Sequence, residues 1–219
     1  MGTGYWPLFD LVVETPRVTL RYVDDELAVE LIELAGRGIH DPATMPFSIP
    51  WTDLPSPRFE RESLQFYWSR RAGLRPDDWS LQMAVIVDGV TVGLTDLLAT
   101  DFPRLRGVAT GSWLGREFQG HGIGKEMRIA TLTLGFDGLG ADYATTGAFH
   151  DNEASKGVTR SLGYEPTGWH DTLRRDERDR ILEYRMSREH WLTIRRDDIT
   201  IDGLEPCLDL LGVEPPERH

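Results

Sequence analysis

Alternation of apolar and polar residues along several short stretches of this chain predicts half-buried β-strands. The first is RVTLRYV at 17–23, and two β-rich runs, WSLQMAVIV and VTVGLTDLLA, meet at Asp88-Gly89. Asp-Gly is a favoured two-residue turn, so residues 79–99 are predicted to form a hairpin. Further strands are predicted at about 108–114, at 143–150 and in a hairpin over 168–187.

Apolar residues at helical spacing separate these strands. Asp24 and Asp25 can cap a helix whose apolar residues recur three and four positions apart, namely Ala28, Leu31, Ile32 and Ala35. RFERESLQFYWSRRAG predicts a second helix, and the segment after Gly124 is apolar on nearly every side, which is typical of a buried helix. Asn152 is predicted to cap a short helix that Gly163 stops. This succession of strands and helices predicts one α/β (α+β) unit.

Other segments carry neither period. Residues 40–57 (HDPATMPFSIPWTDLPSP) contain five prolines and are predicted to form a long loop, which in a compact domain is often functional. The charge run RRDERDR at 174–180 is expected to be solvated at a hairpin tip. No pattern in the acidic, proline-ended segment 198–219 predicts where it lies in the fold. We therefore predict a domain over 1–197 and a C-terminal tail of unknown role.

Composition narrows the possible functions. The chain has 219 residues, a formal net charge of −12 and one cysteine, Cys207. One cysteine excludes a disulfide framework and a cysteine-based metal site, and the histidines show no metal-ligand spacing, so no metal is predicted. The acidic balance disfavours nucleic acid, and no apolar run approaches the ~20 residues that span a membrane. A reducing cytoplasm is the simplest location. An acidic surface suits a cationic partner such as an amine, although many solvated proteins are simply acidic.

The stretch GSWLGREFQGHGIGKEMR at 111–128 combines a glycine-rich turn with the start of a helix. A P-loop requires Ser or Thr after Gly-Lys, where this chain has Glu126. A dinucleotide fingerprint is G-x-G-x-x-G after the first strand, whereas this turn is G-x-G-x-G after the fourth predicted strand. The remaining pattern, Gln119-x-x-Gly122-x-Gly124, lies between a strand and a buried helix. Unpaired N–H groups at a helix start, approached closely over glycines, suit a pyrophosphate.

This remaining pattern resembles the acyl-CoA loop of the GNAT superfamily, written Gln/Arg-x-x-Gly-x-Gly/Ala. SWLG before it resembles the strand that carries the family's acyl donor. NEASKGVTRSLGY and ETPRVTLR resemble the branch that includes the ribosomal-protein N-terminal acetyltransferases. WPLFDL and HDPATMPFSIPW are similar to a bacterial subgroup that includes a proposed succinyl-CoA user. The resemblance covers about residues 14–190, and the order and spacing of these short motifs make it specific.

The resemblance implies a single GNAT fold, with a mixed and mostly antiparallel central sheet flanked by helices and a V-shaped opening between the fourth and fifth predicted strands. It implies acyl-CoA as co-substrate, with its diphosphate on the glycine turn and its pantetheine arm beside the 111–114 strand. A backbone N–H near Trp113 or Leu114 is expected to face the thioester oxygen. The cofactor-binding residues implied are Trp113, Leu114, Gln119, Gly120, His121, Gly122, Ile123, Gly124, Lys125, Asn152 and Ser155.

The chemistry implied is direct attack of an amine on the thioester, and two common catalytic positions differ here. Relatives often have glutamate two residues before Gly111, where this chain has Ala109, and many members have tyrosine where this chain has Thr159. His40 and Asp41 on the proline-rich loop are therefore candidate proton acceptors. A His-Asp pair before proline is also an ordinary turn.

Ser155 is the candidate proton donor to the departing thiolate, and its alternative role is that of a serine on a helix surface. The resemblance implies transfer of an acyl group, acetyl by default, to a primary amine of a small molecule or a protein. Succinyl is the alternative donor group, whose carboxylate would need a cation. A non-catalytic acyl-CoA-binding module is a second alternative, and a nucleotide kinase or dehydrogenase requires a loop that prefers ATP or NAD. Related proteins often pair, so a homodimer is expected. The candidate cations for a succinyl group are Arg37, Arg58, Arg70 and Arg71.

Overall fold

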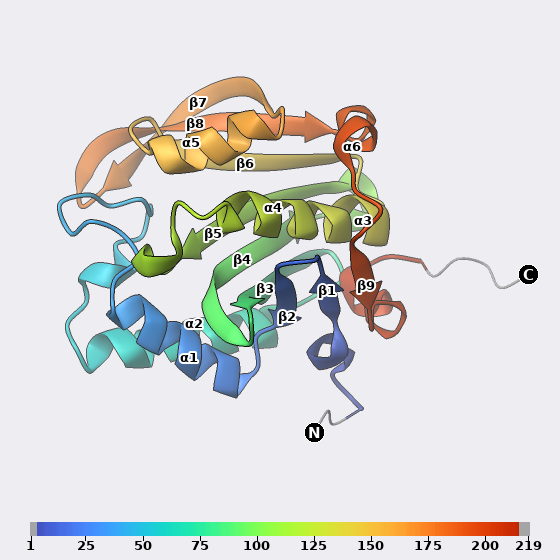
Figure 1. Cartoon of the computed structure of the whole chain (residues 1–219), viewed down its shortest axis with the longest axis horizontal. Coiled ribbons are helices and arrows are strands. Elements are labelled where there is room, and N and C mark those ends of the chain that lie inside the picture. Colours follow the sequence, from blue (N-terminus) through green and yellow to red (C-terminus); the bar gives the residue numbers. More distant parts are fainter. Residues whose placement is uncertain (1–3, 215–219) are drawn as a thin grey trace, which may run out of the picture.

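The computed structural model describes residues 4–214, in which strands and helices alternate along the chain (Figure 1). The strands are β1 (Val12–Glu14), β2 (Thr19–Tyr22), β3 (Asp78–Val87), β4 (Val90–Thr100), β5 (Gly107–Leu114), β6 (Tyr143–Phe149), β7 (Glu165–Arg174), β8 (Glu177–Ser187) and β9 (Thr200–Asp202). The helices are α1 (Asp25–Gly36), α2 (Arg58–Gly73), α3 (Phe102–Leu105), α4 (Ile123–Thr133), α5 (Glu153–Ser161) and α6 (Arg188–Ile194).

The described strands form a single nine-stranded sheet in the order β7-β8-β6-β5-β4-β3-β2-β1-β9. Every neighbouring pair is antiparallel except β5 and β6, which run parallel. This arrangement confirms the predicted α/β (α+β) class and the mixed, mostly antiparallel sheet. The predicted hairpin over 79–99 is β3 and β4, joined at Asp88-Gly89 with both turn residues at positive φ.

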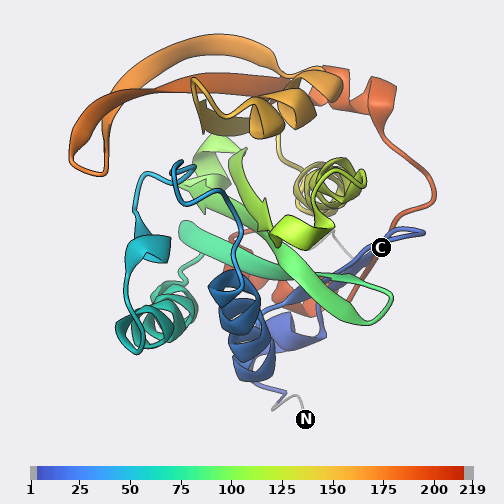
Figure 2. The same cartoon turned by 60° about the vertical axis from the view of Figure 1, so that its left-hand side comes forward.

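Helices cover both faces of this sheet, and Figure 2 shows α1 and α2 on one side of the central strands and α4 on the other. α1 begins where Asp24 Oδ1 accepts a hydrogen bond from Leu27 N at 2.8 Å, which confirms the predicted cap. Its apolar stripe packs with α2 against Ala84 and Leu94 of β3 and β4. α4 is buried along most of its length, as predicted, in a second cluster that includes Leu97 of β4.

The parallel pair β5 and β6 opens into a V. The two strands are paired only at Gly107↔Tyr143, Val108↔Ala144 and Ala109↔Thr145. Beyond Ala109, β5 continues beside β4 as far as Leu114, whereas β6 continues beside β8. The V-shaped opening therefore lies between the fourth and fifth predicted strands, where the resemblance places it.

The segment after residue 197 packs onto the sheet. β9 pairs with β1 on the side opposite β2, and Cys207, Leu208 and Leu211 are buried in the cluster to which α4 also contributes. The indole Nε1 of Trp79 donates to the carbonyl oxygen of Leu211 at 3.1 Å. Three-residue strands and single 3₁₀ turns are too short to show a period, so this placement leaves no pattern in the sequence.

Among residues 4–214 no helix is both long enough and apolar enough to cross a bilayer. The same residues contain no group of three or more His, Cys, Asp or Glu side chains placed to hold a metal ion.

Candidate active site

A cavity of about 970 Å³ joins the two faces of the sheet at the V between β5 and β6. On the α4 side its wall includes Met127 of α4 and Ser155 of α5. On the opposite side its wall includes Trp51 of the proline-rich loop and Tyr67 of α2. Two molecules that enter from opposite faces can therefore meet at the V.

The glycine turn, where the chain passes from β5 to α4, adjoins this cavity through Gln119 and Gly124. Gly120 and Gly122 both have φ of +81°, a conformation that strains residues with a Cβ atom. Gly122 is the N-cap of α4 and supplies no side-chain cap, so the first N–H groups of the helix are open to a ligand. Gly124 has ordinary packing, since a Cβ there would lie 3.6 Å from Val158 of α5.

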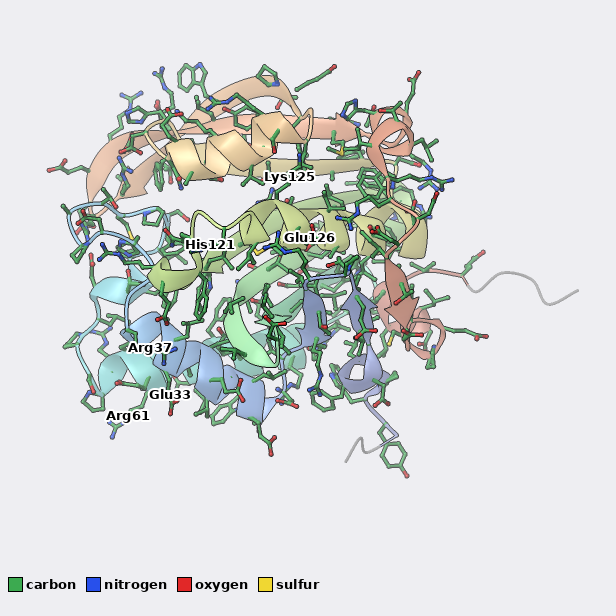
Figure 3. The ribbon with its side chains drawn as sticks, in the orientation of Figure 1. Glu33, Arg37, Arg61, His121, Lys125 and Glu126 are labelled. Carbon is green, nitrogen blue, oxygen red and sulfur yellow. The ribbon has the colours of Figure 1, made fainter. Side chains whose placement is uncertain are left out.

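Arg17 is a basic neighbour of this turn that sequence reasoning missed. Its Nη2 donates to the carbonyl oxygen of His121 at 3.0 Å, and its Nη1 lies 3.6 Å from the position that a Cβ on Gly122 would take. Figure 3 places His121 in the turn and Lys125 in the first turn of α4. Arg17 is 104 residues from His121, so only tertiary structure brings its positive charge here.

Gln119 ties the turn to the proline-rich loop. Its side-chain Nε2 donates to the carbonyl oxygens of Ile39 at 2.8 Å and Leu114 at 2.9 Å. The amide group thus joins the start of the 40–57 loop to the end of β5. These contacts give the glutamine of the motif a structural role in holding both ends of the cavity together.

Asn152 and Ser155 lie together on the cavity wall at the start of α5. Asn152 Oδ1 accepts a hydrogen bond from Ser155 N at 3.1 Å, so the predicted helix cap is present. Thr159, in contrast, is fully buried and donates its hydroxyl to the carbonyl oxygen of Ser155 at 2.9 Å. Ser155 is therefore the hydroxyl of α5 that lines the cavity.

His40 and Asp41 also line the cavity, but their hydrogen bonds brace the loop. His40 Nδ1 lies 2.8 Å from the carbonyl oxygen of Asp41, and Nε2 lies 2.7 Å from Thr52 Oγ1. A carbonyl only accepts, so a neutral His40 carries its proton on Nδ1 and accepts from Thr52 through Nε2. Asp41 Oδ1 accepts from Ala43 N at 2.9 Å, the bond of an ordinary turn. Both ring nitrogens of His40 are thus engaged in this structure, and its role as proton acceptor stays a prediction.

Asp96 of β4 is a carboxylate in the cavity wall that sequence reasoning missed. It pairs across the sheet with Gly111, where a Cβ would lie 3.4 Å from Asp96 Oδ2. Asp96 Oδ1 is inaccessible to solvent and has no hydrogen-bond partner among the described residues. Burial raises the pKa of Asp96 to about 7, against the lowering influence of Arg70 and Arg128. The signal in the sequence was a single charged residue within the β-rich run VTVGLTDLLA.

Arg128 of α4 bridges the two arms of the V. Its side chain donates to Thr146 Oγ1 on β6 at 3.1 Å and to Ser112 Oγ on β5 at 3.2 Å. Arg128 is 4% exposed, its Nε has no hydrogen-bond partner, and within residues 4–214 it forms no ion pair. The cavity therefore contains a buried guanidinium beside the strand ends. The four arginines considered from the sequence, Arg37, Arg58, Arg70 and Arg71, lie outside the cavity lining.

The tip of the β7–β8 hairpin reaches the proline-rich loop, so the expectation of a fully solvated charge run is wrong for Arg174. The Arg174 side chain is 17% exposed, makes two 2.9 Å bonds to Asp151, and donates to the carbonyl oxygen of Met45 at 3.3 Å. Arg175 binds both carboxylate oxygens of Asp53 at 2.6 and 2.8 Å. The hairpin therefore holds the loop over the cavity.

Comparison with known proteins identifies one matching family and several similar folds. Residues 17–165 match the family described as Acetyltransferase (GNAT) domain. The fold is similar to that of a ribosomal-protein-S5-alanine acetyltransferase from Vibrio fischeri, with a TM-score of 0.63, 18% identity, and coverage of 82% of this chain and 98% of that chain. A GCN5-related N-acetyltransferase from Brucella melitensis gives 0.65, 17%, and 83% and 80%. The ribosomal L7/L12 alpha-N-protein acetyltransferase RimL in complex with coenzyme A gives 0.65, 15%, and 80% and 97%.

Proposed function

The chain belongs to the GNAT acetyltransferase family, and we propose that it transfers an acyl group from acyl-coenzyme A to a primary amine. The observation that carries this proposal is the single cavity that joins the glycine turn on one face of the sheet to a carboxylate-containing chamber on the other. A donor bound at the turn and an amine bound in the chamber can meet in a ternary complex. Acyl transfer is then direct, without an intermediate on the protein.

Donor binding uses the open main chain of this region. The N–H groups at the start of α4 and the partial positive charge of that helix end suit the coenzyme A diphosphate, with Arg17 and Lys125 nearby. Among the described strands none pairs with β5 on its β6 side beyond Ala109, and past Thr110, whose carbonyl accepts from Thr146 Oγ1, its main chain is available to the amide groups of the pantetheine arm. A backbone N–H near Trp113 or Leu114 would stabilise the oxyanion, an interaction worth about 3–4 kcal/mol.

Departure of the thiolate needs only modest help, because a thiol has a pKa near 8.5. Ser155 lines the donor side of the cavity and is the proposed proton donor to the sulfur, directly or through water. Asn152, which caps α5, keeps Ser155 in place and is proposed to contact the pantetheine arm.

Donor binding is tested by calorimetric titration of acetyl-CoA, CoA, ATP and NAD into the wild type and Gly122→Ala. The variant places a Cβ and a strained φ on the phosphate side of the turn, so we expect at least a tenfold loss of CoA affinity. Gly89→Ala is the matched control, because Gly89 has φ of +78° and open space around it in the β3–β4 turn. Equal affinity in all three proteins, or tighter binding of ATP or NAD, would reject the donor site.

The acyl group is acetyl by default, and Arg128 favours succinyl as a second candidate. A buried guanidinium with a free Nε and no carboxylate partner can receive the terminal carboxylate of a dicarboxylic acyl chain. The test compares kcat/KM for acetyl-CoA and succinyl-CoA in the wild type and in Arg128→Lys. A preference for succinyl-CoA of tenfold or more, ~1.4 kcal/mol, that falls in the variant would support succinyl transfer. A preference for acetyl-CoA in the wild type would exclude it.

The acceptor is proposed to be a primary amine of a small molecule or a protein, and the ribosomal-protein acetyltransferases among the similar structures favour a protein amine. Turnover with any amine would reject a non-catalytic acyl-CoA-binding module. The expected homodimer is tested by light scattering after size exclusion, and a monomer across the working concentration range would reject it.

A further inference from the structure

We propose that the chamber on the α2 side of the sheet binds an amine carried on an apolar, preferably aromatic, body, and that Asp96 receives its ammonium group and then one of its protons. The proposal rests on the acyl transfer proposed above and adds the acceptor site and its chemical class. It also assigns the proton acceptor. Asp96 on β4 takes the role that relatives often give to a glutamate at the position of Ala109 on the neighbouring strand β5.

Asp96 faces the side of the sheet opposite to the donor turn. Side chains two residues apart on a strand share a face, so Asp96 lies on the face of Leu94, and their partners Gly111 and Trp113 lie on that same face. Leu94 packs in the cluster formed by α1 and α2. An amine at Asp96 therefore approaches from the α2 side, while the thioester comes through the V from the α4 side.

The surroundings of Asp96 leave its charge unmatched. The ionisable groups that act on it are Tyr67 and Arg70 of α2 and Arg128 of α4, and neither arginine pairs with it within 4 Å. Burial raises the pKa of Tyr67 well above its usual value, and the nearby Asp96 charge adds to this, so Tyr67 stays neutral. A buried carboxylate oxygen without a partner is costly in a folded protein. An ammonium ion supplies the missing charge and the missing hydrogen bond.

Aromatic side chains wall the chamber around this carboxylate. The Trp51 ring lies 5.4 Å from that of Phe47 and 6.0 Å from that of Trp113, and all three line the cavity. Phe66 and Ile49 also line the cavity and are 39% and 72% exposed. They therefore form an apolar rim that is in contact with solvent. Aromatic faces attract cations and bury apolar bodies, so the walls suit both parts of such an amine.

The other acids that line the cavity are less available than Asp96. Glu62 pairs with Arg58, Asp151 with Arg174, and Glu153 with lysine and arginine of its own helix. Asp41 accepts the N–H of Ala43 in its turn. Asp96 is therefore the one buried carboxylate without a partner among the acids that line the chamber, whereas Asp41 is exposed, which favours a single ammonium on an apolar body over a polyamine.

The bound ammonium, R–NH₃⁺, gives one proton to the Asp96 carboxylate, and its nitrogen lone pair then attacks the thioester carbonyl carbon. The C–N bond forms and the C–S bond breaks, so the electron pair leaves on sulfur. The nitrogen loses a second proton as the amide forms, and the thiolate takes up one proton to become CoA–SH. Asp96 returns the remaining proton to solvent.

The test measures kcat/KM by CoA release with acetyl-CoA or succinyl-CoA, whichever the wild type prefers. The amines are phenethylamine, tryptamine, agmatine and spermidine, together with short peptides that begin with Phe or Ser. We expect the aromatic amines, or the peptide that begins with Phe, to exceed agmatine and spermidine at least tenfold. Phenethylamine ahead of the peptide assigns the apolar body to a small molecule, and the reverse assigns it to a protein chain. A preference for spermidine or agmatine overturns the proposal.

Two variants and a control separate the roles. Asp96→Asn should lower kcat about 10²–10⁴-fold and remove the rise of kcat/KM with pH near 7, with acyl-CoA affinity unchanged. Trp51→Ala should raise KM for the best amine at least tenfold more than it lowers kcat. Glu33→Gln, which changes an exposed carboxylate of α1 outside the cavity (Figure 3), should match the wild type. Full activity of Asp96→Asn overturns the proposal, whereas absence of acyl-CoA binding in the wild type instead rejects the proposed function.

Discussion

Replacing Asp96 with asparagine is expected to stabilise the fold at neutral and alkaline pH while removing activity. Burial raises the pKa of this carboxyl from an ordinary value of 3.8 to about 7. A carboxyl whose pKa is about 7 in place of 3.8 costs the folded state roughly 4 kcal/mol when it is ionised above pH 7. That is a large part of the 5–15 kcal/mol that typically separates folded from unfolded domains.

The pH dependence of this cost has a definite sign. Below about pH 4 the carboxyl is protonated in both folded and unfolded chains, and it costs the fold nothing. Between about pH 4 and 7 the unfolded chain has lost its proton and the folded protein keeps it, so stability falls as pH rises. Above about pH 7 both forms are ionised and the penalty is constant. Asparagine does not titrate, so any effect of its own burial is the same at every pH.

The assay is urea unfolding of the wild type, Asp96→Asn and Glu33→Gln at several pH values from 4.5 to 8.5. The difference in free energy of unfolding between Asp96→Asn and the wild type should grow with pH up to about pH 7 and then level off. Glu33→Gln, on the exposed surface of α1, should show no such rise. A difference that stays flat across this range, or grows as pH falls, would falsify the reasoning.

Further predictions concern the donor end, the C-terminal segment and the loop. Arg17→Ala should weaken acetyl-CoA binding about two- to fivefold at low salt and less at high salt, because the side chain is exposed. Calorimetry at two salt concentrations measures this, and an unchanged affinity at low salt would contradict it. Leu211→Ala should cost about 2–5 kcal/mol of unfolding free energy, since Leu211 is fully buried beneath the sheet; a cost under about 1 kcal/mol in urea unfolding would show that residues after 197 do not belong to the cooperative fold. Arg175→Ala should release Asp53 and loosen the 40–57 loop. The KM for the amine should rise several-fold, with no change in the Kd of acetyl-CoA. A changed Kd with the same KM would contradict the role of the hairpin in holding the loop over the cavity.

Local patterns predicted the elements that build the site. The hairpin of β3 and β4 follows from its two β-rich runs and the Asp-Gly turn, and the start of α1 follows from Asp24. The glycine turn was recognisable from the spacing Gln119-x-x-Gly122-x-Gly124 directly before a helix, and the structure gives Gly122 a positive φ. Each of these features depends on residues within a few positions of one another, so the sequence carries them directly.

The proton acceptor shows what local patterns leave out. Position 109 holds alanine, and a search of the same strand finds no carboxylate. Asp96 reaches the same cavity from the neighbouring strand, through its pairing with Gly111. That register is set by the whole sheet, and only burial among distant groups raises the pKa of Asp96 to about 7. The sequence alone does not reveal which face of the sheet such an aspartate occupies or which groups surround it.

The sequence by itself therefore determined the strands, the helices and the phosphate-type turn, because hydrophobic period, capping and positive φ act over a few residues. Tertiary structure decided that β5 and β6 part after Ala109, that Arg17 reaches the glycine turn, and that Arg174 and Asp96 line one cavity. The contacts of Arg17 with His121 and of Arg174 with Met45 join segments more than a hundred residues apart. These contacts form only when the whole sheet packs around its core. The same packing fixes the burial of each group in the site, and burial in turn fixes its charge state and its access to a substrate.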